Sequence, residues 1–234
     1  MNKRIIDRIE FAAELSQGKR VLDLGGKGGG IECAPATLSS MYGKLVNFGA
    51  RKGKPIPSEL RFPTIYKNIS ARAADYKVVD CKAQPGVDYV INFDEPGAMK
   101  QLGNIIANYS PEIILCMETL EHVGHSRALM DEMARSVENG TEVFITLPNN
   151  GNWVLNALGW GRSHLVAFLR SNANCFIRQS NLGRYEVVEY ECIGRYSRLW
   201  RLVYLVSGFQ PFSWGFHIKK TIQPKPGQPP KTGP

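Results

Sequence analysis

The sequence predicts an α/β fold built on a mostly parallel β-sheet. Two observations lead to this prediction. Apolar runs of strand length alternate along the chain with segments of helical periodicity, an order typical of parallel strands joined by right-handed crossovers. The first of these runs, RVLDLG at residues 20–25, passes directly into a cluster of glycines. A strand that leads into a glycine loop is typical of a nucleotide-binding site.

The first segment of the chain shows helical periodicity. Its apolar residues recur at helical spacing up to Leu15, and Gly18 follows as a stop signal. We therefore expect a helix over residues 3–16, followed by the strand at 20–25. Residues 31–72 have no clear period and contain the loop-like sequence KGKPIPSE, so we interpret them as an insertion around one helix.

Later apolar runs extend the sheet. The runs at 76–80, 87–93 and 112–117 predict three more strands, followed by a helix over 126–137 and a strand over 141–148. We further expect a helix near 165–178, a strand at 185–194, an aromatic helix near 197–207 and a closing strand over 214–222. These elements predict one domain over residues 1–222, a flexible tail at 223–234, and a ligand crevice at the carboxyl ends of the strands.

The composition agrees with a folded domain. The 234 residues are 43% hydrophobic and 21% charged, which provides enough apolar material for a core. The five cysteines include no CxxC pair, so we expect neither a disulfide framework nor a structural zinc. The N-terminal stretch is charged throughout and no segment reaches about 18 consecutive apolar residues, so we expect a cytoplasmic protein. The net charge of +8 favours an anionic partner, substrate or surface.

The glycine-rich loop VLDLGGKGGG spans residues 21–30. Glycines allow backbone N–H groups to approach a ligand, and both dinucleotides and adenosyl cofactors bind to such loops. A plain tight turn is the alternative. Asp80, at the end of the next strand, is placed to accept hydrogen bonds from both hydroxyls of a ribose. A strand-ending aspartate in an ordinary turn is the alternative for that residue.

These residues resemble the class I S-adenosylmethionine (SAM)-dependent methyltransferases of the type 11 and type 23 groups, over residues 15–194. VLDLGG is similar to the first motif of that family, VDYVINFD to its third strand and adenine loop, and CMETLEHV to the end of its fourth strand. ENGTEVFITLPN then stands at the place of the fifth strand. CMETLEHV most closely resembles the quinone-biosynthesis O-methyltransferases. One departure is Lys27, where the family usually has glycine.

The resemblance implies a fold, a cofactor and a binding site. The fold is a doubly wound, Rossmann-like sheet of seven strands in the order 3-2-1-4-5-7-6, with strand seven antiparallel. The cofactor is SAM, and the reaction is methyl transfer to a small-molecule acceptor, with oxygen as the expected accepting atom. Asn92 and Phe93 flank the adenine in this interpretation, and Cys81 lines the same pocket unless it is a buried core cysteine. The whole expected cofactor-binding set is Asp23, Gly25, Gly26, Gly28, Gly29, Asp80, Cys81, Asn92, Phe93 and Glu118.

Methyl transfer is an in-line displacement, so an enzyme chiefly aligns the acceptor with the methyl group and excludes water. An oxygen acceptor also has to lose a proton, which a neutral histidine can take near neutral pH. His164 is our first candidate for this base, because it follows the fifth strand and begins HLVAF, which resembles the substrate cover of the family. His122 is the second candidate and His125 the third. His217, on the closing strand, is expected to be structural.

Glu118, Glu121 and His122 stand at spacings i, i+3 and i+4 after the fourth strand. On one helical face they would converge and bind a divalent ion, magnesium or manganese, that lowers the pKa of the acceptor hydroxyl. In the alternative interpretation, Glu118 contacts the cofactor, Glu121 occupies the first turn of a helix and His122 packs against the loop.

Two segments are candidates for contact with the acceptor or a membrane. Residues 195–216 interleave arginines with aromatic residues, a pattern that suits an anionic substrate or peripheral contact with a lipid surface. A solvated basic face is the alternative. After the fifth strand, an apolar wall beside Asn149 and His164 suits an apolar acceptor, with ordinary helix packing as the alternative. The wall consists of Trp153, Leu155, Leu158, Trp160 and Phe168.

Three other functions share part of this pattern. A nicotinamide-dependent oxidoreductase also uses a glycine loop and an acidic strand end, but the sequence has no Tyr-x-x-x-Lys pair and CMETLEHV counts against it. The charge of +8 suggests a module that binds or modifies nucleic acid, but motifs for base methylation are absent and the positive charge is spread along the chain. A catalytically silent partner with a cofactor-binding fold is the third.

Overall fold

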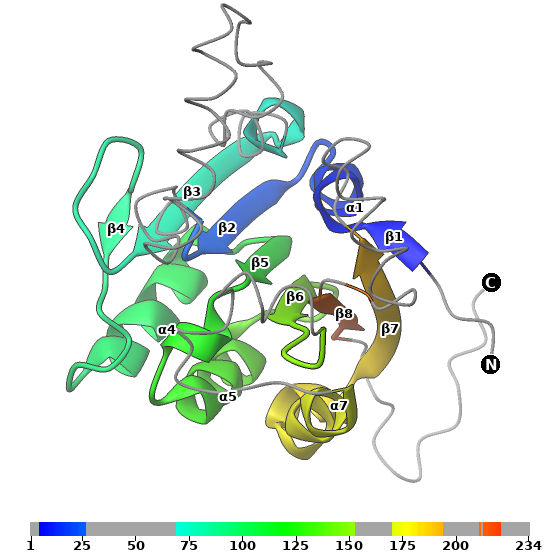
Figure 1. Ribbon diagram of the computed structural model, residues 1–234. Helices are drawn as coiled ribbons and strands as arrows, with labels where there is room; N and C mark the ends of the chain where they lie inside the picture. The colour runs from blue at the N-terminus through cyan, green and yellow to red at the C-terminus, as the bar shows by residue number, and fades with distance from the viewer. Residues whose placement is uncertain (1–4, 27–68, 153–169, 194–210, 212, 221–234) are drawn as a thin grey trace, which may run out of the picture.

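The computed structural model describes residues 5–26, 69–152, 170–193, 211 and 213–220. Within these residues, one eight-stranded sheet runs through the middle of the molecule, in the order β1-β7-β8-β6-β5-β2-β3-β4 (Figure 1). The strands are β1 (Ile5–Asp7), β2 (Arg20–Leu24), β3 (Asp75–Asp80), β4 (Tyr89–Val90), β5 (Ile113–Met117), β6 (Glu142–Pro148), β7 (Glu186–Ile193) and β8 (Ser213–Lys219).

The strand order follows the order implied by the resemblance, with one addition. β2, β3, β4, β5, β6, β7 and β8 stand where strands one to seven were expected, so the order 3-2-1-4-5-7-6 is confirmed. β8 pairs antiparallel with both β6 and β7, as expected of strand seven, whereas the other neighbouring pairs are parallel. The expected count of seven is wrong by one, because β1 adds an eighth strand beside β7.

The eighth strand arises where a helix was expected from residue 3. Helix α1 (Arg8–Leu15) begins only after Asp7, whose Oδ1 accepts hydrogen bonds from the backbone N–H groups of Ile9 at 3.0 Å and Glu10 at 3.2 Å. Such an aspartate N-cap fixes the start of a helix, because it satisfies N–H groups that have no partner inside the helix. The residues before the cap are left extended, and Ile5 and Ile6 pair with β7.

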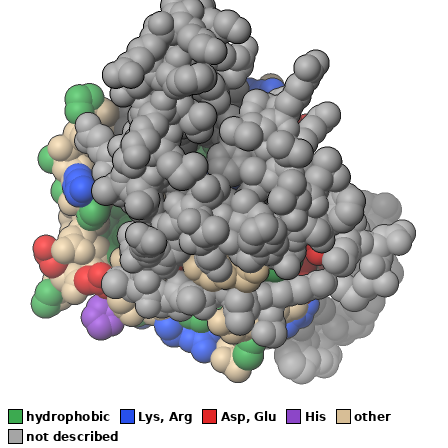
Figure 2. Space-filling view, viewed as in Figure 1, with side chains coloured by type: hydrophobic (Ala, Val, Ile, Leu, Met, Phe, Trp, Pro, Cys, Tyr) green, Lys and Arg blue, Asp and Glu red, His purple; other side chains and the backbone are tan. Residues whose placement is uncertain are grey.

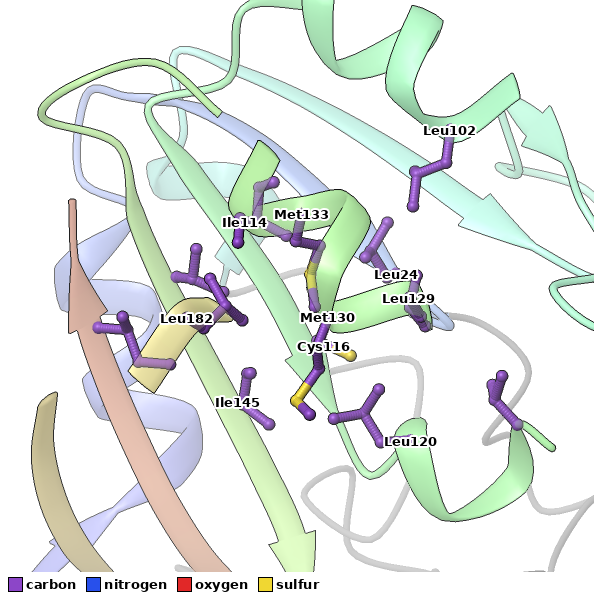
Figure 3. Close-up of a cluster of buried hydrophobic side chains, with 14 of the residues drawn as sticks. Leu24, Leu102, Ile114, Cys116, Leu120, Leu129, Met130, Met133, Ile145 and Leu182 are labelled. Carbon is purple, nitrogen blue, oxygen red and sulfur yellow. The ribbon is translucent and has the colours of Figure 1, made fainter. Parts of the chain in front are cut away.

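Helices pack on both faces of the sheet, which makes the fold doubly wound (Figure 1). On one face lie α4 (Ala98–Tyr109), α5 (Ser126–Ser136) and α7 (Arg170–Gln179), with the short helices η3 (Leu120–His122) and η4 (Asn181–Arg184). The side chains of Leu24, Leu102 and Met133 meet between this layer and the sheet (Figure 3). On the other face, Ala12 and Ala13 of α1 pack against Phe144.

Strand alternation decides which face each residue of β2 occupies. Leu22 and Leu24 point into the core beneath α4 and α5, so Val21 and Asp23 lie on the face of α1.

No helix of the described residues is long and apolar enough to cross a membrane. In the space-filling view, lysine and arginine side chains of the described residues lie in separate places at the rim of the drawn face, in agreement with the spread of positive charge along the sequence (Figure 2).

Several expected elements differ from the structure or fall outside it. Helix α4 was not expected, although Ala98, Leu102 and Ile106 give it one buried face. The strand expected over 87–93 shrinks to Tyr89–Val90. Residues 69–72 are helical, but the rest of the expected insertion lies outside the described residues, as do the aromatic helix near 197–207, the tail and the start of the helix expected from 165.

Candidate active site

Several of the expected site residues lie at the carboxyl ends of the neighbouring strands β2, β3 and β5. These three strands are parallel neighbours, with Leu24 opposite Val79 and Asp23 opposite Leu115. Their carboxyl ends therefore lie side by side, and the chain leaves each of them next to the others (Figure 1). Gly25, Asp80 and Glu118 stand at these three ends.

The first glycines of the loop are required by close packing. Gly25 has φ +79°, and its N–H donates to the carbonyl of Val79 at 2.7 Å. A Cβ on Gly25 would lie 2.4 Å from Thr119 Oγ1, and a Cβ on Gly26 would lie 2.2 Å from Asp23 Oδ2. A side chain at either position would displace its neighbour, so the backbone here is bare. Gly28 and Gly29 lie outside the described residues.

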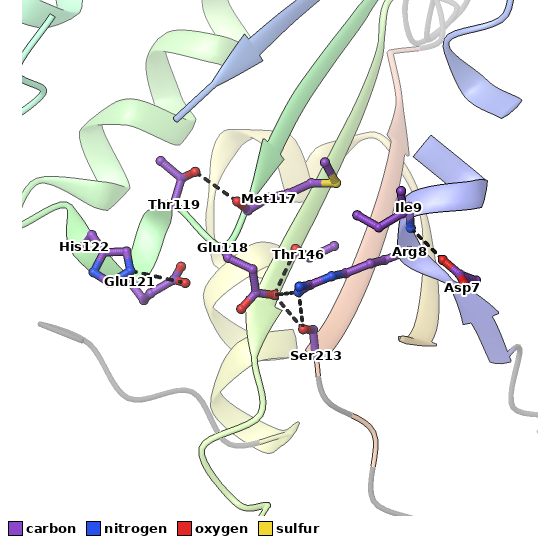
Figure 4. Close-up of polar contacts among 10 residues, drawn as sticks. All are labelled: Asp7, Arg8, Ile9, Met117, Glu118, Thr119, Glu121, His122, Thr146 and Ser213. Atoms are coloured by element: carbon purple, nitrogen blue, oxygen red, sulfur yellow. Dashed lines mark hydrogen bonds and ion pairs between the residues drawn. The ribbon is translucent and has the colours of Figure 1, made fainter. Parts of the chain in front are cut away.

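Thr119 connects the ends of β2 and β5. Its hydroxyl donates to the carbonyl of Leu24 at 2.8 Å and lies 3.2 Å from the carbonyl oxygen of Met117 (Figure 4). The residue after β5 thus packs directly against the glycine turn after β2. Sequence reasoning did not single out Thr119, because a hydroxyl within a motif gives no sign of the backbone that it contacts.

Two buried aspartates stand on the face of the sheet opposite α4 and α5. Asp23 and Asp80 each have 1% of their surface exposed. Burial raises the pKa of Asp23 to about 7; the hydrogen bond from the Tyr76 hydroxyl lowers this pKa, and the charge of Asp80 raises it. Asp80 Oδ1 accepts a hydrogen bond from the N–H of Lys82 at 3.0 Å, whereas Oδ2 has no hydrogen-bond partner among the described residues. A buried acceptor without a donor fits a ribose hydroxyl.

The residues expected around the adenine have different environments. Asn92 is exposed, and its amide donates to Glu95 at 3.1 Å and accepts from the N–H of Asp94 at 3.2 Å. Phe93 is 6% exposed and belongs to the core on the α4 side. Cys81 is exposed directly after Asp80, so its alternative interpretation as a buried core cysteine is wrong. Burial of part of the thiol and the adjacent Asp80 raise the pKa of Cys81.

Glu118 occupies a strained conformation and is held by several side chains. Its φ of +53° is uncommon for a residue other than glycine. Its Oε1 accepts hydrogen bonds from Thr146 Oγ1 at 3.1 Å and Ser213 Oγ at 2.5 Å, and forms an ion pair with Arg8 Nη1 at 2.7 Å (Figure 4). The backbone N–H of Glu118 donates to the carbonyl of Thr146 at 3.1 Å.

The three residues expected to bind a metal do not converge. The carboxylate of Glu118 turns toward Arg8, while Glu121 and His122 lie together on η3 (Figure 4). The helical spacing does not apply to Glu118, because its left-handed conformation lies outside the short helix that holds the other two residues. Within the part of the chain that the structure describes, no group of three His, Cys, Asp or Glu residues is placed to hold a metal ion.

Glu121 is the most buried of these side chains. Neither of its carboxylate oxygens has a hydrogen-bond partner among the described residues, and His122 Nε2 lies 3.8 Å from its Oε1. Burial and the nearby Glu118 hold the pKa of Glu121 well above its usual range. The alternative interpretation of Glu121, as an anion in the first turn of a helix, agrees with its place in η3.

The candidate bases are placed differently. The side chain of His122 is 46% exposed at the site edge. His125 is exposed before α5, with its N–H donating to Asp94 at 3.0 Å. His217 contacts Glu142 at 2.6 Å, in agreement with a structural role. His164 lies outside the described residues, together with the wall at 153–168; Asn149, beside that wall, is buried and donates to the carbonyl of Pro211 at 2.9 Å.

Comparisons with known proteins agree with this geometry. The family description "Methyltransferase domain" (Methyltransf_23) matches residues 1–186, most of the chain, so the chain belongs to this methyltransferase family. No curated protein sequence matches the chain. The family makes the chain a methyltransferase, and its fold is similar to that of solved SAM-dependent methyltransferases.

Two solved structures illustrate the likeness of the fold. One is a chain of the complex between the Haloferax volcanii Trm112 methyltransferase activator and a methyltransferase, with 10% identity, a TM-score of 0.53, and coverage of 91% of this chain and 88% of that one. The other is a SAM-dependent methyltransferase from Archaeoglobus fulgidus, with 14% identity, a TM-score of 0.50, and coverage of 91% of both chains.

Proposed function

We propose that this methyltransferase acts on a small-molecule acceptor and places the methyl group on oxygen. The observation that carries the proposal is the meeting of three features on neighbouring strand ends: a bare glycine turn, a buried aspartate with one open oxygen, and a glutamate at the end of β5. The preference for a small oxygen acceptor rests on the resemblance of CMETLEHV to quinone-biosynthesis O-methyltransferases.

The chain's residues suit SAM in two independent ways. Gly25 and Gly26 carry no side chain that could cover the backbone at the end of β2, and a Cβ at either position would overlap Thr119 or Asp23. Asp80 Oδ2 is a buried acceptor without a donor among the described residues. When bound, SAM supplies a methyl group activated by a positively charged sulfur. In our proposal the glycine turn holds the methionine part of the cofactor, and Gly28 and Gly29 are assigned to the same role from the sequence alone.

The remaining roles are assigned by position. Asp80 accepts the ribose hydroxyls, and Cys81, Asn92 and Phe93 border the adenine. Adenine contact by Phe93 requires the edge of its ring, because most of the side chain is already packed in the core. His164, or else His122, removes the acceptor proton. We assign no divalent ion to this site, because Oε1 of Glu118 forms an ion pair with Arg8 and its carboxylate is turned away from Glu121 and His122.

Calorimetric titration tests the cofactor. The purified chain is expected to bind SAM and its demethylated product S-adenosylhomocysteine, and not to bind nicotinamide dinucleotides, because Asp80 and the adjoining strand ends provide for one ribose and one adenine. Binding of a nicotinamide dinucleotide in place of SAM would favour the oxidoreductase instead. Binding of neither would refute the proposed function.

A macromolecular acceptor or an activator subunit is the second candidate. The net charge of +8 and the similarity in fold to a chain of the Trm112 complex favour it. Incubating the enzyme with SAM that is radiolabelled in its methyl group and with a fractionated cell extract separates the two candidates. Label in the low-mass fraction supports the small-molecule acceptor, and label in RNA or protein supports the second.

A further inference from the structure

The carboxylate of Glu118 is held from one side only. Three donors converge on Oε1, and they come from three different elements: Arg8 from α1, Thr146 from β6 and Ser213 from β8. No hydrogen bond reaches Oε2 from the described residues, and the side chain is 18% exposed. One oxygen is therefore fixed while the other is left open.

Glu118 is the chain neighbour of a residue that contacts the glycine turn. The next residue, Thr119, packs against Gly25 and donates to the carbonyl of Leu24 at 2.8 Å. Glu118 itself has φ +53°, a conformation that persists only where the surroundings hold it. The hydrogen bond from its N–H to Thr146 and the three donors on Oε1 provide that restraint.

We propose that Arg8 is a positioning residue of the cofactor site: it holds Oε1 of Glu118 so that Oε2 stays unpaired and accepts a hydrogen bond from the ammonium group of the methyl donor. This inference rests on the proposed function. It gives the β1–α1 segment a role in the site, because Asp7 starts α1 at the residue that carries the guanidinium. Ser213 joins the arrangement, since its hydroxyl accepts from Arg8 at 3.0 Å and donates to Glu118.

A purely electrostatic role and a positioning role of Arg8 predict opposite changes in SAM affinity when Arg8 is replaced. SAM is a cation at its sulfur, so a nearby guanidinium repels it, and removal of the charge alone would strengthen binding. If Arg8 instead orients Glu118, its removal frees the carboxylate to rotate and weakens binding. The direction of the change therefore identifies the role.

The test is a double-mutant cycle read by calorimetric titration with SAM. We expect Arg8→Ala and Glu118→Gln each to weaken binding by about tenfold, the lower range for loss of a charged hydrogen bond. The double variant should bind no more weakly than Glu118→Gln, because Arg8 acts through Glu118. Arg8→Lys should recover part of the affinity, since a point charge replaces one of the contacts of the guanidinium.

Arg72→Ala is the matched control. Arg72 lies near the amino end of β3 and forms an ion pair at 2.9 Å with Glu10 of α1, the helix that also carries Arg8. Its loss should leave SAM affinity unchanged. Melting temperatures of all variants show whether each is folded. If Arg8→Ala does not fold, Ser213→Ala, which removes another donor to the same oxygen, replaces it in the cycle.

Unchanged or tighter SAM binding in folded Arg8→Ala would overturn the inference and leave the proposed function intact. Additive losses in the double variant would also overturn it, because Arg8 would then act independently of Glu118. A coupling seen in the melting temperature but not in affinity would give Arg8 a purely structural role. If the wild-type chain binds no SAM, the proposed function fails, and this inference fails with it.

Discussion

Carboxylates at the two ends of the sheet differ in whether the protein provides them with partners. At the amino end of β6, Glu142 meets Lys19 at 3.0 Å and His217 at 2.6 Å. Although burial raises the pKa of Glu142, hydrogen bonds from Lys19 and His217 lower it below its ordinary value. At the carboxyl ends of β3 and β5, Asp80 and Glu121 keep buried oxygens without a hydrogen-bond partner among the described residues.

We infer from this difference that Glu142 stabilises the fold, whereas Asp80 and Glu121 are candidates for contact with a ligand. A buried carboxylate without a donor lowers stability unless something else binds it, so an unpaired group at a strand end is a sign of a binding site. The paired group at the other end needs no ligand to explain it. Five experiments test this distinction, in order of expected effect.

The largest effect is expected from replacing His164, the proposed base, which is not one of the carboxylates compared above. His164→Ala should lower kcat by about 10²–10⁴-fold with SAM affinity intact, because a positioned base contributes that much to proton removal. Single-turnover rates normalised to folded protein measure it once an acceptor is known. Rates within about twofold of wild type would transfer the role to His122.

Asp23→Asn should change how stability depends on pH. The pKa of Asp23 rises from 3.8 to about 7 on folding, so the folded state binds more protons between these values and the unfolding free energy falls as pH rises. Removing the charge should therefore stabilise the ligand-free protein at pH 8, by at most about 4 kcal/mol. Urea denaturation at pH 5 and pH 8 measures this. An unaltered pH dependence would contradict the raised pKa.

Asp80→Ala should weaken SAM binding by about 10- to 100-fold, the range for a hydrogen bond to a charged group. The melting temperature should hardly change, because loss of the hydrogen bond from Lys82 to Oδ1 is offset by removal of the buried, unpaired Oδ2. Asp75→Ala, at the exposed start of the same strand, provides the control. Equal affinities in the two variants would remove Asp80 from the site.

Glu142→Gln should reduce the free energy of unfolding at neutral pH by about 1–2 kcal/mol, since it weakens the contacts to Lys19 and His217. The pKa of Glu142 is lowered by folding, so its contribution is present above the unfolded value of 4.5 and is lost as pH falls through the folded pKa. Urea denaturation compares it with Glu112→Gln, a half-exposed partner of Arg20. SAM affinity should not change in either variant.

The smallest effect is expected from chelation. Excess chelator should leave both SAM binding and methyl transfer unchanged, because Glu118, Glu121 and His122 do not converge. Loss of turnover that magnesium or manganese restores would show that the three side chains rearrange around an ion.

The sequence predicted features that depend on neighbouring residues in the chain. The positions of Asp23, Gly25 and Asp80 at or next to strand ends were predicted correctly, because strand ends are local patterns, and parallel pairing then brings those ends together. Their roles in binding stay a prediction. Helix α4 shows that one such pattern was overlooked, since Ala98, Leu102 and Ile106 are spaced four residues apart.

Features that depend on distant contacts could not be found in this way. The strand β1 exists because β7 pairs with it, and Arg8 meets Glu118 only once the sheet is assembled. The expected metal ligands failed for a related reason: the spacing of Glu118 from His122 assumes a helix, whereas tertiary contacts hold Glu118 in the left-handed region. Tyr76 was missed because its contact with Asp23 crosses from β3 to β2.

The pairing of β1 with β7 also determines when, during synthesis of the chain, the contacts of β1 and Arg8 can form. Ile5 and Ile6 are synthesised early, yet their partners Glu191 and Cys192 leave the ribosome much later. Contacts between such distant residues form late in folding, because a long loop must close first. Arg8 reaches Ser213 under the same restriction. Nascent chains that end before β8 therefore lack this contact, and full cofactor affinity is expected only after β8 has been added.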